Sequence, residues 1–322
     1  ELLLLLSSII LLSPYYRTSA YWALNENYGL ISAMLSLVCL NFFLKKNEIE
    51  KKINKYFYLT IFFSSLSVYY DQKYLIVTMI CFFSIIFSKI NIKIKIYTLL
   101  TYLFFSIPYL ILIYEWGGIV PSKTQILNPK TITNLSRLSN MHFYHLGYAS
   151  TIISFYLFPL LMLKEGNILQ NIQRFFSSKW CYVIISIPLI YIYLIYINYD
   201  FKSYTVDEYW IGLGVVHKSS LILFSNLKYQ EIFTYIIFFF SWIVIFLYVE
   251  KKITDCLIII FFLSFSILIW PLMQEYFDPI LIILALMAFK TKIKLNYYNV
   301  FFIFLYFFSF LACANIYYLK IF

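Results

Sequence analysis

Apolar runs that approach 20 residues recur along the whole chain, separated by charged residues, prolines or glycines. A helix of roughly 20 apolar residues crosses the hydrocarbon core of a bilayer, so this spacing predicts membrane-spanning helices. The chain is 62% apolar and only 12% charged, whereas about one quarter of the residues in soluble globular proteins are charged. The sequence therefore predicts an all-α, polytopic transmembrane protein.

We predict about eleven membrane helices in a single polytopic domain that covers residues 1–322. Three of the runs, 56–70, 74–88 and 279–289, are short for complete spans, so we expect them to use flanking residues or to end inside a protein-lined cavity. The five cysteines lie in apolar runs without a Cys-x-x-Cys pair, which indicates neither disulfides nor a zinc site. The predicted helices cover residues 2–14, 26–44, 56–70, 74–88, 96–114, 144–163, 180–197, 230–249, 256–272, 279–289 and 297–317.

The basic residues predict the orientation of these helices. Sixteen of the 25 Lys and Arg residues lie in one set of short alternate loops, and nine lie in the opposite set, which holds nearly twice as many acidic residues. Cytoplasmic loops retain basic residues, so the first set is predicted to be cytoplasmic. The two long polar segments, 115–143 and 198–229, then face the outside or a lumen. We expect a multi-pass protein of a bacterial inner membrane or of the endoplasmic reticulum membrane.

The same loops limit the possible partners. The formal net charge of +10 indicates contact with anionic membrane lipids and gives no argument for nucleic acid. The sequence lacks Gly-x-Gly-x-x-Gly and phosphate-binding Gly-Lys-Ser/Thr motifs, and the predicted cytoplasmic loops are too short to hold a nucleotide. Any sugar or phosphate donor must therefore be lipid-borne or extracytoplasmic.

The first predicted outer break reads Ser-Pro-Tyr-Tyr-Arg and ends at Arg17, and Glu26 stands at the entry of the next helix. An Arg guanidinium grips a phosphate through two parallel hydrogen bonds, so Arg17 is a candidate phosphate ligand. The alternative is an interfacial membrane anchor beside Tyr and Trp residues. Glu26 is a candidate catalytic carboxylate.

Asp71, Gln72 and Lys73 form the second outer break, between two short predicted helices. If those helices end in a cavity, Asp71 orients an acceptor hydroxyl or acts as a base, and Lys73 meets a phosphate. Gln72 is counted with the substrate-binding candidates. The alternative is a hairpin turn with a local Asp–Lys ion pair.

The third break begins at Glu115, continues as Trp-Gly-Gly-Ile-Val-Pro, and leads through Arg137 to His142 and His145. Gly-Gly followed by Pro exposes backbone that a sugar or pyrophosphate can approach. His142 and His145 share a helix face, a spacing that suits phosphate or metal contact. The alternative for both histidines is interfacial hydrogen bonding.

Two further outer segments carry acidic residues. Asp207 and Glu208 are an adjacent pair that either binds a divalent cation or is solvated in its loop. Segment 270–279 contains two prolines that end the helices on both sides, which holds the acids Glu275 and Asp278 at the interface. These acids either contact substrate or solvate the turn. Gln274 and Glu275 are counted with the substrate-binding candidates. We expect no resident cofactor, and a divalent metal is left open.

Four breaks together carry a resemblance to a known family. Ser-Pro-Tyr-Tyr-Arg, Tyr-Tyr-Asp-Gln-Lys-Tyr, Trp-Gly-Gly-Ile-Val-Pro and Gln-Glu-Tyr-Phe-Asp-Pro, in this order, resemble the GT-C superfamily of membrane glycosyltransferases. The Gly-Gly-Ile-Val element at 117–120 is similar to one in the dolichyl-phosphate-glucose-dependent α-1,2-glucosyltransferases. The resemblance covers the breaks and not the helices.

This resemblance implies transfer of a sugar from a polyprenyl-phosphate donor to a lipid-linked or protein glycan acceptor on the luminal or periplasmic side. Such enzymes use a carboxylate in their first outer loop. The chain begins at Glu1 without Met and enters an apolar run at once. If run 2–14 corresponds to the third helix of the family, that carboxylate precedes Glu1, so we expect an N-terminal truncation.

The leading hypothesis is therefore a membrane hexosyltransferase. Arg17 and Lys73 hold the donor phosphate in this hypothesis, and Asp71 or Glu26 assists at the sugar or acceptor. One alternative is an oligosaccharide polymerase or ligase that acts on polyprenyl-pyrophosphate glycans. Another is a flippase or other transporter of lipid-linked glycans, which should line a membrane-deep cavity with cationic side chains.

Overall fold

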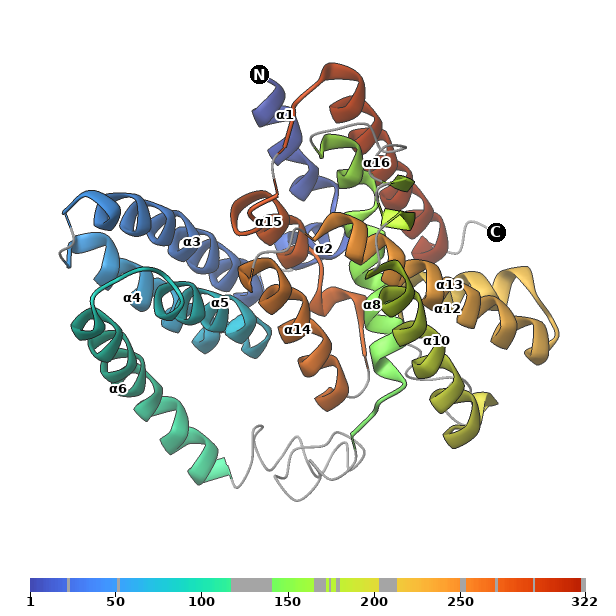
Figure 1. Cartoon of the computed structure of the whole chain (residues 1–322), viewed down its shortest axis with the longest axis horizontal. Helices are drawn as coiled ribbons and strands as arrows, with labels where there is room; N and C mark the ends of the chain where they lie inside the picture. The colour runs from blue at the N-terminus through green and yellow to red at the C-terminus, as the bar shows by residue number, and fades with distance from the viewer. Residues whose placement is uncertain are drawn as a thin grey trace. The chain divides into compact units, whose positions relative to one another are not determined.

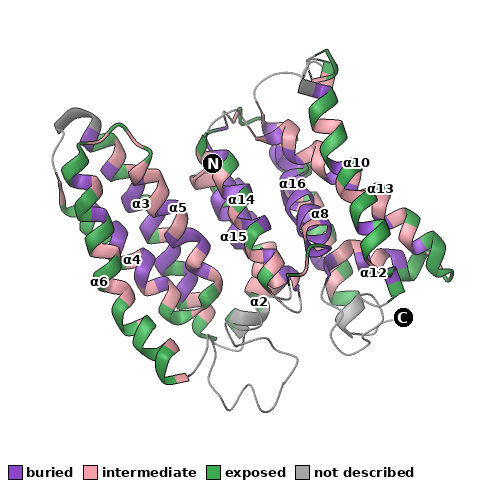
Figure 2. Cartoon of the chain, turned by 60° about the horizontal axis from the view of Figure 1, so that its bottom comes forward, coloured by how far each residue is buried: buried purple, intermediate pink, exposed green. Residues whose placement is uncertain are grey.

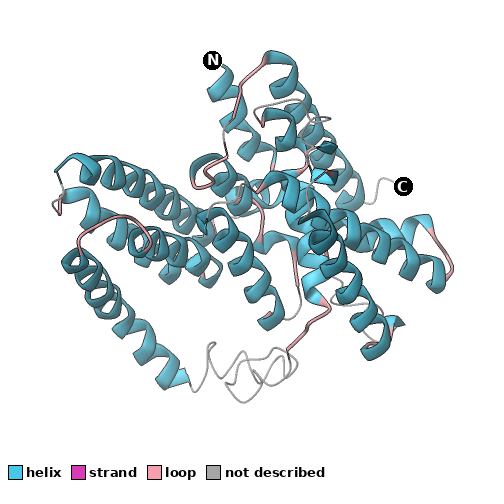
Figure 3. Cartoon of the chain, viewed as in Figure 1, coloured by secondary structure: helices cyan, strands magenta, loops and turns pink. Residues whose placement is uncertain are grey.

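The computed structural model confirms the all-α prediction for the described part of the chain, where every element is an α- or 3-10 helix (Figure 3). The chain divides into two compact units. Unit 1 comprises Glu1–Arg17 and Met141–Phe322, and unit 2 comprises Thr18–Asn140. The structure describes residues 1–21, 24–50, 53–116, 141–164, 172–173, 175–177, 180–202, 213–249, 253–269, 272–291 and 293–319.

Unit 2 is built on a helical hairpin of α3 (Asn25–Glu50) and α4 (Lys55–Tyr70), with α5 (Leu75–Ile86) and α6 (Ile92–Trp116) packed beside α4 (Figure 1). The Asn54 side chain accepts a hydrogen bond from the Tyr56 amide at 3.0 Å, which caps the start of α4. Buried serines and threonines line the helix contacts, and Thr78 Oγ1 donates to the Ser64 carbonyl at 2.7 Å. Small polar residues of this kind allow close helix packing in membrane proteins.

Unit 1 contains the remaining helices. Helix α8 is central and packs against α12, α13, α14 and α15. Eleven of its thirteen residues are buried. Figure 2 accordingly shows α8 largely in purple. The helices of unit 1 are α1 (Leu2–Ser7), η1 (Ser8–Leu12), the start of α2 (Pro14–Tyr21), α8 (His145–Leu157), η4 (Pro159–Leu163), α10 (Trp180–Asn198), α12 (Gly214–Leu223), α13 (Leu227–Tyr248), α14 (Ile253–Leu268), η5 (Gln274–Tyr276), α15 (Ile280–Met287) and α16 (Tyr297–Leu319).

A glycine sets the distance between α8 and α13. A Cβ built on Gly147 would lie 2.3 Å from Cε2 of Phe238, so only glycine fits beside this ring. The Tyr191 hydroxyl of α10 accepts a hydrogen bond from the Gly147 amide at 2.7 Å and donates to the Phe143 carbonyl at 3.0 Å. Both contacts fix the first turn of α8 against its neighbours.

Six described helical segments are long and apolar enough to cross a membrane. This supports a membrane protein, whereas the larger number of about eleven membrane helices stays a prediction. The predicted run 279–289 corresponds to α15, whose eight residues span only about 12 Å. The side chains of α15 from Ile280 to Ala285 are all buried, so this helix packs against protein. The six segments are Asn25–Asn47, Ile92–Trp116, His145–Leu163, Cys181–Asn198, Leu227–Tyr248 and Tyr297–Ile316.

One end of unit 1 joins residues from three predicted cytoplasmic breaks. Lys164 Nζ donates to the Leu247 and Tyr248 carbonyls at 2.8 and 3.1 Å and so satisfies the C-terminal end of α13. The buried Asp255 carboxylate accepts the Lys290 amide at 2.9 Å. Segments assigned to one side of the membrane therefore meet in space, as alternating crossings require.

Candidate functional site

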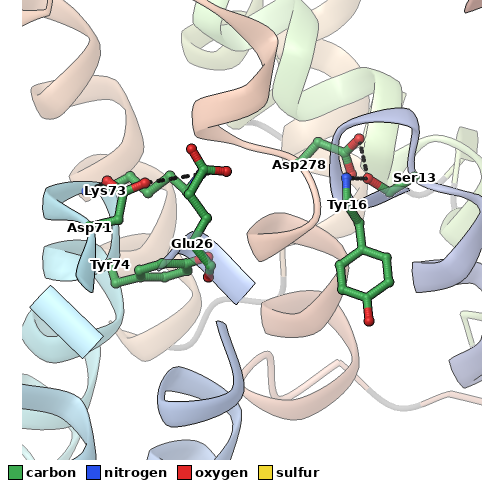
Figure 4. A network of polar contacts seen from close by, with 7 residues as sticks. All are labelled: Ser13, Tyr16, Glu26, Asp71, Lys73, Tyr74 and Asp278. Atoms are coloured by element: carbon green, nitrogen blue, oxygen red, sulfur yellow. Dashed lines mark hydrogen bonds and ion pairs between the residues drawn. The ribbon is translucent and has the colours of Figure 1, made fainter. Parts of the chain in front are cut away.

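Three charged residues of unit 2 converge at the predicted outer break between α4 and α5. Lys73 Nζ lies 3.0 Å from Glu26 Oε2 and 3.2 Å from Asp71 Oδ2. The Lys73 side chain is 8% exposed, whereas those of Asp71 and Glu26 are 24% and 34% exposed. Figure 4 shows both carboxylates directed at this lysine. The cluster therefore places a largely buried cation behind two solvent-accessible carboxylates.

Local structure explains how Asp71 reaches this position. Its amide donates to the Ser67 carbonyl at 3.2 Å and ends α4, while its Oδ1 accepts the Lys73 amide at 3.0 Å and begins the short helix η2 (Gln72–Tyr74). Asp is a preferred residue at such a cap because its side chain satisfies an amide that has no partner within the helix. The second carboxylate oxygen stays available for Lys73.

Glu26 comes from another helix and is brought to the cluster by the packing of Tyr74. The Tyr74 hydroxyl donates to the Glu26 carbonyl at 2.7 Å, as the two labelled residues in Figure 4 show. A Cβ on Gly29 would lie 2.5 Å from the Tyr74 ring, so the glycine leaves room for this contact. Tyr74 is buried, and it therefore holds the start of α3 against η2.

The arrangement of Asp71 and Glu26 around Lys73 determines which chemistry these side chains can perform. An ammonium between two carboxylates fixes their direction through charge-assisted contacts. The carboxylates can then accept a proton from a hydroxyl or orient it. With two carboxylates around it, Lys73 is better suited to hold Asp71 and Glu26 than to bind an anion. Its role as a phosphate ligand stays a prediction.

Unit 1 contains a pocket of about 160 Å³ where four segments predicted to reach the outer side meet. Its polar side chains include Tyr15, Lys218, Ser219 and Gln274. The pKa of Lys218 is lowered because burial removes water from the ammonium. The complete lining is Pro14, Tyr15, Val215, Lys218, Ser219, Ile222, Gln274, Phe310, Cys313 and Ala314.

Gln274 connects this pocket to a buried hydrogen-bond network. Its Oε1 accepts the Val215 amide at 3.1 Å, which satisfies the first turn of α12. Its Nε2 donates to the Tyr156 hydroxyl at 3.0 Å in α8. Gln274 is 4% exposed and bonded at both ends of its amide, so its side chain is held in one orientation. It therefore presents a fixed polar edge to the pocket.

Asp278 forms a second buried contact in the same turn. The Ser13 hydroxyl donates to Asp278 Oδ2 at 2.7 Å and accepts the Tyr16 amide at 2.9 Å, as Figure 4 shows. Ser13 and Asp278 are each 1% exposed. This contact joins the end of η1 to the turn before α15. The sequence places Asp278 at a helix edge, and the structure adds that its carboxylate is buried inside the protein.

His142 and His145 lie together, with ring centroids 5.1 Å apart. The His142 amide donates to the Ile267 carbonyl at 3.0 Å, and His145 Nδ1–H donates to the Ser266 carbonyl at 3.0 Å. Both histidines thus satisfy carbonyls at the C-terminal end of α14. Burial lowers the pKa of His142. These contacts agree with the hydrogen-bonding alternative, and substrate contact by the pair stays a prediction.

The other candidates are distributed along both units. Arg17 is exposed on α2, three residues after the pocket residue Pro14. Gln72 is exposed in η2 beside the charged cluster, and Glu115 is exposed in the last turn of α6. Glu275 is half-buried in η5, next to Gln274. Arg137, Asp207 and Glu208 lie outside the described residues.

Sequence reasoning did not select Lys218 or Ser219 as site residues, because segment 198–229 reads as a polar outer loop. The signal that marks them is local. Residues 214–223 read Gly-Val-Val-His-Lys-Ser-Ser-Leu-Ile-Leu, an apolar stretch with one lysine inside a polar segment, and they form α12. Gly214 has φ +74°, a conformation that glycine tolerates, and it begins this helix.

Among the described residues, no group of three or more His, Cys, Asp or Glu side chains is placed to hold a metal ion. No protein-family model, characterised protein or solved structure matches this chain.

Proposed function

We propose that the protein is a membrane glycosyltransferase that transfers a hexose from a polyprenyl-phosphate donor to an acceptor on the non-cytoplasmic side. The observation that carries this proposal is the convergence of Glu26 and Asp71 on Lys73 at a predicted outer break. Glycosyl transfer to a hydroxyl requires a group that accepts or directs its proton, and a positioned carboxylate is such a group.

The roles of the residues follow from burial and charge. Asp71 caps η2 and pairs with Lys73, so its position is fixed, and it is the proposed base or acceptor-orienting group. Glu26, which pairs with the same lysine, is the second proposed carboxylate. Lys73 pairs with both carboxylates and fixes their direction. Arg17, exposed at the start of α2, remains the proposed phosphate ligand. Arg17→Lys should weaken donor binding because Lys retains the charge but loses the bidentate fork.

The donor class follows from the lipid environment. The predicted cytoplasmic loops are too short to hold a nucleotide, and a polyprenyl-phosphate sugar partitions into the bilayer next to the outer breaks. Its phosphate reaches the protein at the membrane surface, where the charged residues require little desolvation. The acceptor is a glycan on a lipid or protein that is presented on the same side.

The test offers two donors separately to the intact protein in proteoliposomes. We expect radiolabelled hexose to be transferred from polyprenyl-phosphate-hexose and not from nucleotide-hexose. Transfer from the nucleotide sugar alone would reject the proposal. Movement of a lipid-linked glycan across the bilayer without a new glycosidic bond would favour the flippase alternative instead.

A further inference from the structure

The pocket in unit 1 combines one cation with an apolar wall. Lys218 and Ser219 lie on α12, and the facing wall is formed by Phe310, Cys313 and Ala314 in the last turns of α16. The two helices belong to one compact unit, so this juxtaposition is part of a single fold. A ligand that fills the pocket must therefore carry both an anionic group and an apolar group.

The apolar side of the pocket continues onto a surface suited to lipid. Ile222 lines the pocket and is 74% exposed, and its neighbours Leu221 and Leu223 are also exposed. Phe308 of α16 is exposed as well. Leu221 to Leu223 lie on α12 and Phe308 lies on the predicted membrane helix α16, and large exposed apolar side chains of this kind can contact acyl or prenyl chains. A hydrocarbon chain can thus leave the pocket along this surface without entering water.

The polar side of the pocket suits a group with a single negative charge. Lys218 is half-buried in the pocket lining, where an ammonium attracts an anion more strongly than in bulk water. The Ser219 hydroxyl and the fixed amide of Gln274 supply hydrogen-bonding atoms beside it. A volume of about 160 Å³ is below the roughly 300 Å³ of sites for drug-sized ligands. The pocket therefore accommodates a headgroup and the start of a chain.

We propose that this pocket binds the phosphodiester of a membrane lipid, with Lys218 paired to the phosphate and the chain placed along Ile222 and the end of α16. A phosphodiester carries one negative charge, which matches one lysine. Two lipids share this chemistry: an anionic phospholipid of the bilayer and a polyprenyl-phospho-hexose. Only the second source rests on the proposed glycosyltransferase function, and binding itself does not require transfer.

The two exposed cysteines of the described chain provide a direct readout. Cys313 lines the pocket, whereas Cys256 lies on α14, which contributes no pocket residue. The protein in a neutral maltoside detergent is titrated with phosphatidylglycerol, with polyprenyl-phospho-hexose or with uncharged diacylglycerol. The rate of maleimide modification at each cysteine is measured by mass spectrometry. We expect at least one phosphodiester lipid to protect Cys313 and leave Cys256 unchanged, and diacylglycerol to protect neither.

The charge of Lys218 is then tested with matched variants. Lys218→Gln should raise the lipid concentration for half-protection about ten- to a hundred-fold, since a charge-assisted pair is lost. Lys218→Arg keeps the positive charge, should retain protection, and controls for the fold. Lys228→Gln removes the charge of an exposed lysine on the next helix and should leave protection unchanged. If only one of the two phosphodiester lipids protects Cys313, that result identifies the source of the ligand and supports the proposal. Equal protection in Lys218→Gln and wild type, or protection by diacylglycerol, overturns it. Because no sugar transfer is measured, an inactive transferase leaves this result intact.

Discussion

Asp71→Asn separates the two roles of this side chain in unit 2. Asp71 Oδ1 accepts the Lys73 amide at 3.0 Å, and Oδ2 pairs with the Lys73 ammonium at 3.2 Å. Asn is about as good as Asp at a helix N-cap, and its amide oxygen can make the first contact. The substitution removes the negative charge and retains the cap. It therefore tests the charge of the carboxylate while the hydrogen bond that begins η2 is kept.

The structure sets two different magnitudes for this change. The Asp71 side chain is 24% exposed, and Glu26 still lies 3.0 Å from the same ammonium. A partly exposed ion pair of this kind contributes about 0.2–1 kcal/mol, so the loss of stability should be below about 1 kcal/mol. Loss of a general base or orienting group lowers turnover by about 10²–10⁴-fold, which corresponds to roughly 2.7–5.5 kcal/mol in the barrier. The effect on turnover should therefore far exceed the effect on folding.

The assay measures initial rates of hexose transfer in proteoliposomes at saturating donor, with thermal unfolding and donor binding followed on the same preparations. Asp200→Asn is the matched control, because Asp200 Oδ1 also accepts an amide two residues further on, that of Lys202, at 3.4 Å. We expect Asp200→Asn to resemble wild type, and Asp71→Asn to lose turnover more than donor affinity. Equal turnover in both variants would refute a catalytic role for Asp71. A fall in turnover that follows the loss of folded protein would make the residue structural.

Three further predictions concern topology and stability. Cysteines introduced at Lys202 and Lys93 should be labelled from the outside and from the cytoplasm, respectively, by impermeant maleimide, and labelling of both from one side would contradict the assigned orientation. Lys164→Met removes two hydrogen bonds to the end of α13 and should lower stability by about 1–3 kcal/mol in a denaturant titration, whereas Lys93→Met, at an exposed residue, should not. Gly147→Ala overpacks the contact with Phe238 and should cost about 1–3 kcal/mol, with Phe238→Leu restoring part of the loss in the double variant, and an unchanged unfolding temperature for Gly147→Ala would contradict this packing.

The sequence predicted the helical class well because hydropathy reports directly on burial in lipid or protein. It could not separate these two environments. Run 279–289 is as apolar as a membrane span, yet α15 is eight residues long and is buried against protein from Ile280 to Ala285. A turn that contains Asp278 and Pro279 precedes α15, and the helix ends at Met287. Length and packing, which depend on the tertiary structure, decide the role of such a run.

The candidate site was predictable where its residues are local in sequence. The Asp71–Lys73 pair appears both as an expected turn contact and in the structure. Its third member, Glu26, is joined through the buried Tyr74 from a helix more than 40 residues away, and no periodicity indicates that contact. The Lys218 pocket was missed for the same reason, because four distant segments form it. The two histidines were selected for their spacing, but spacing does not show that the His145 imidazole donates to the Ser266 carbonyl at the end of α14.

The location of charge distinguishes the proposed transferase from a flippase. In the described helices that are long enough to cross a membrane, ionised side chains lie in the terminal turns, as Glu26, Lys228 and Glu231 do. The described Lys and Asp residues with buried side chains likewise lie at helix ends: Asp255 on the predicted inner side, and Lys73 and Asp278 on the predicted outer side. Moving a pyrophosphate or sugar-phosphate through the bilayer centre requires cationic partners at that depth, since an unpaired charge there costs about 2.5–3.5 kcal/mol or more. A reaction at the membrane surface has no such requirement. The arrangement of charge therefore favours chemistry on a lipid substrate that remains on one side of the bilayer.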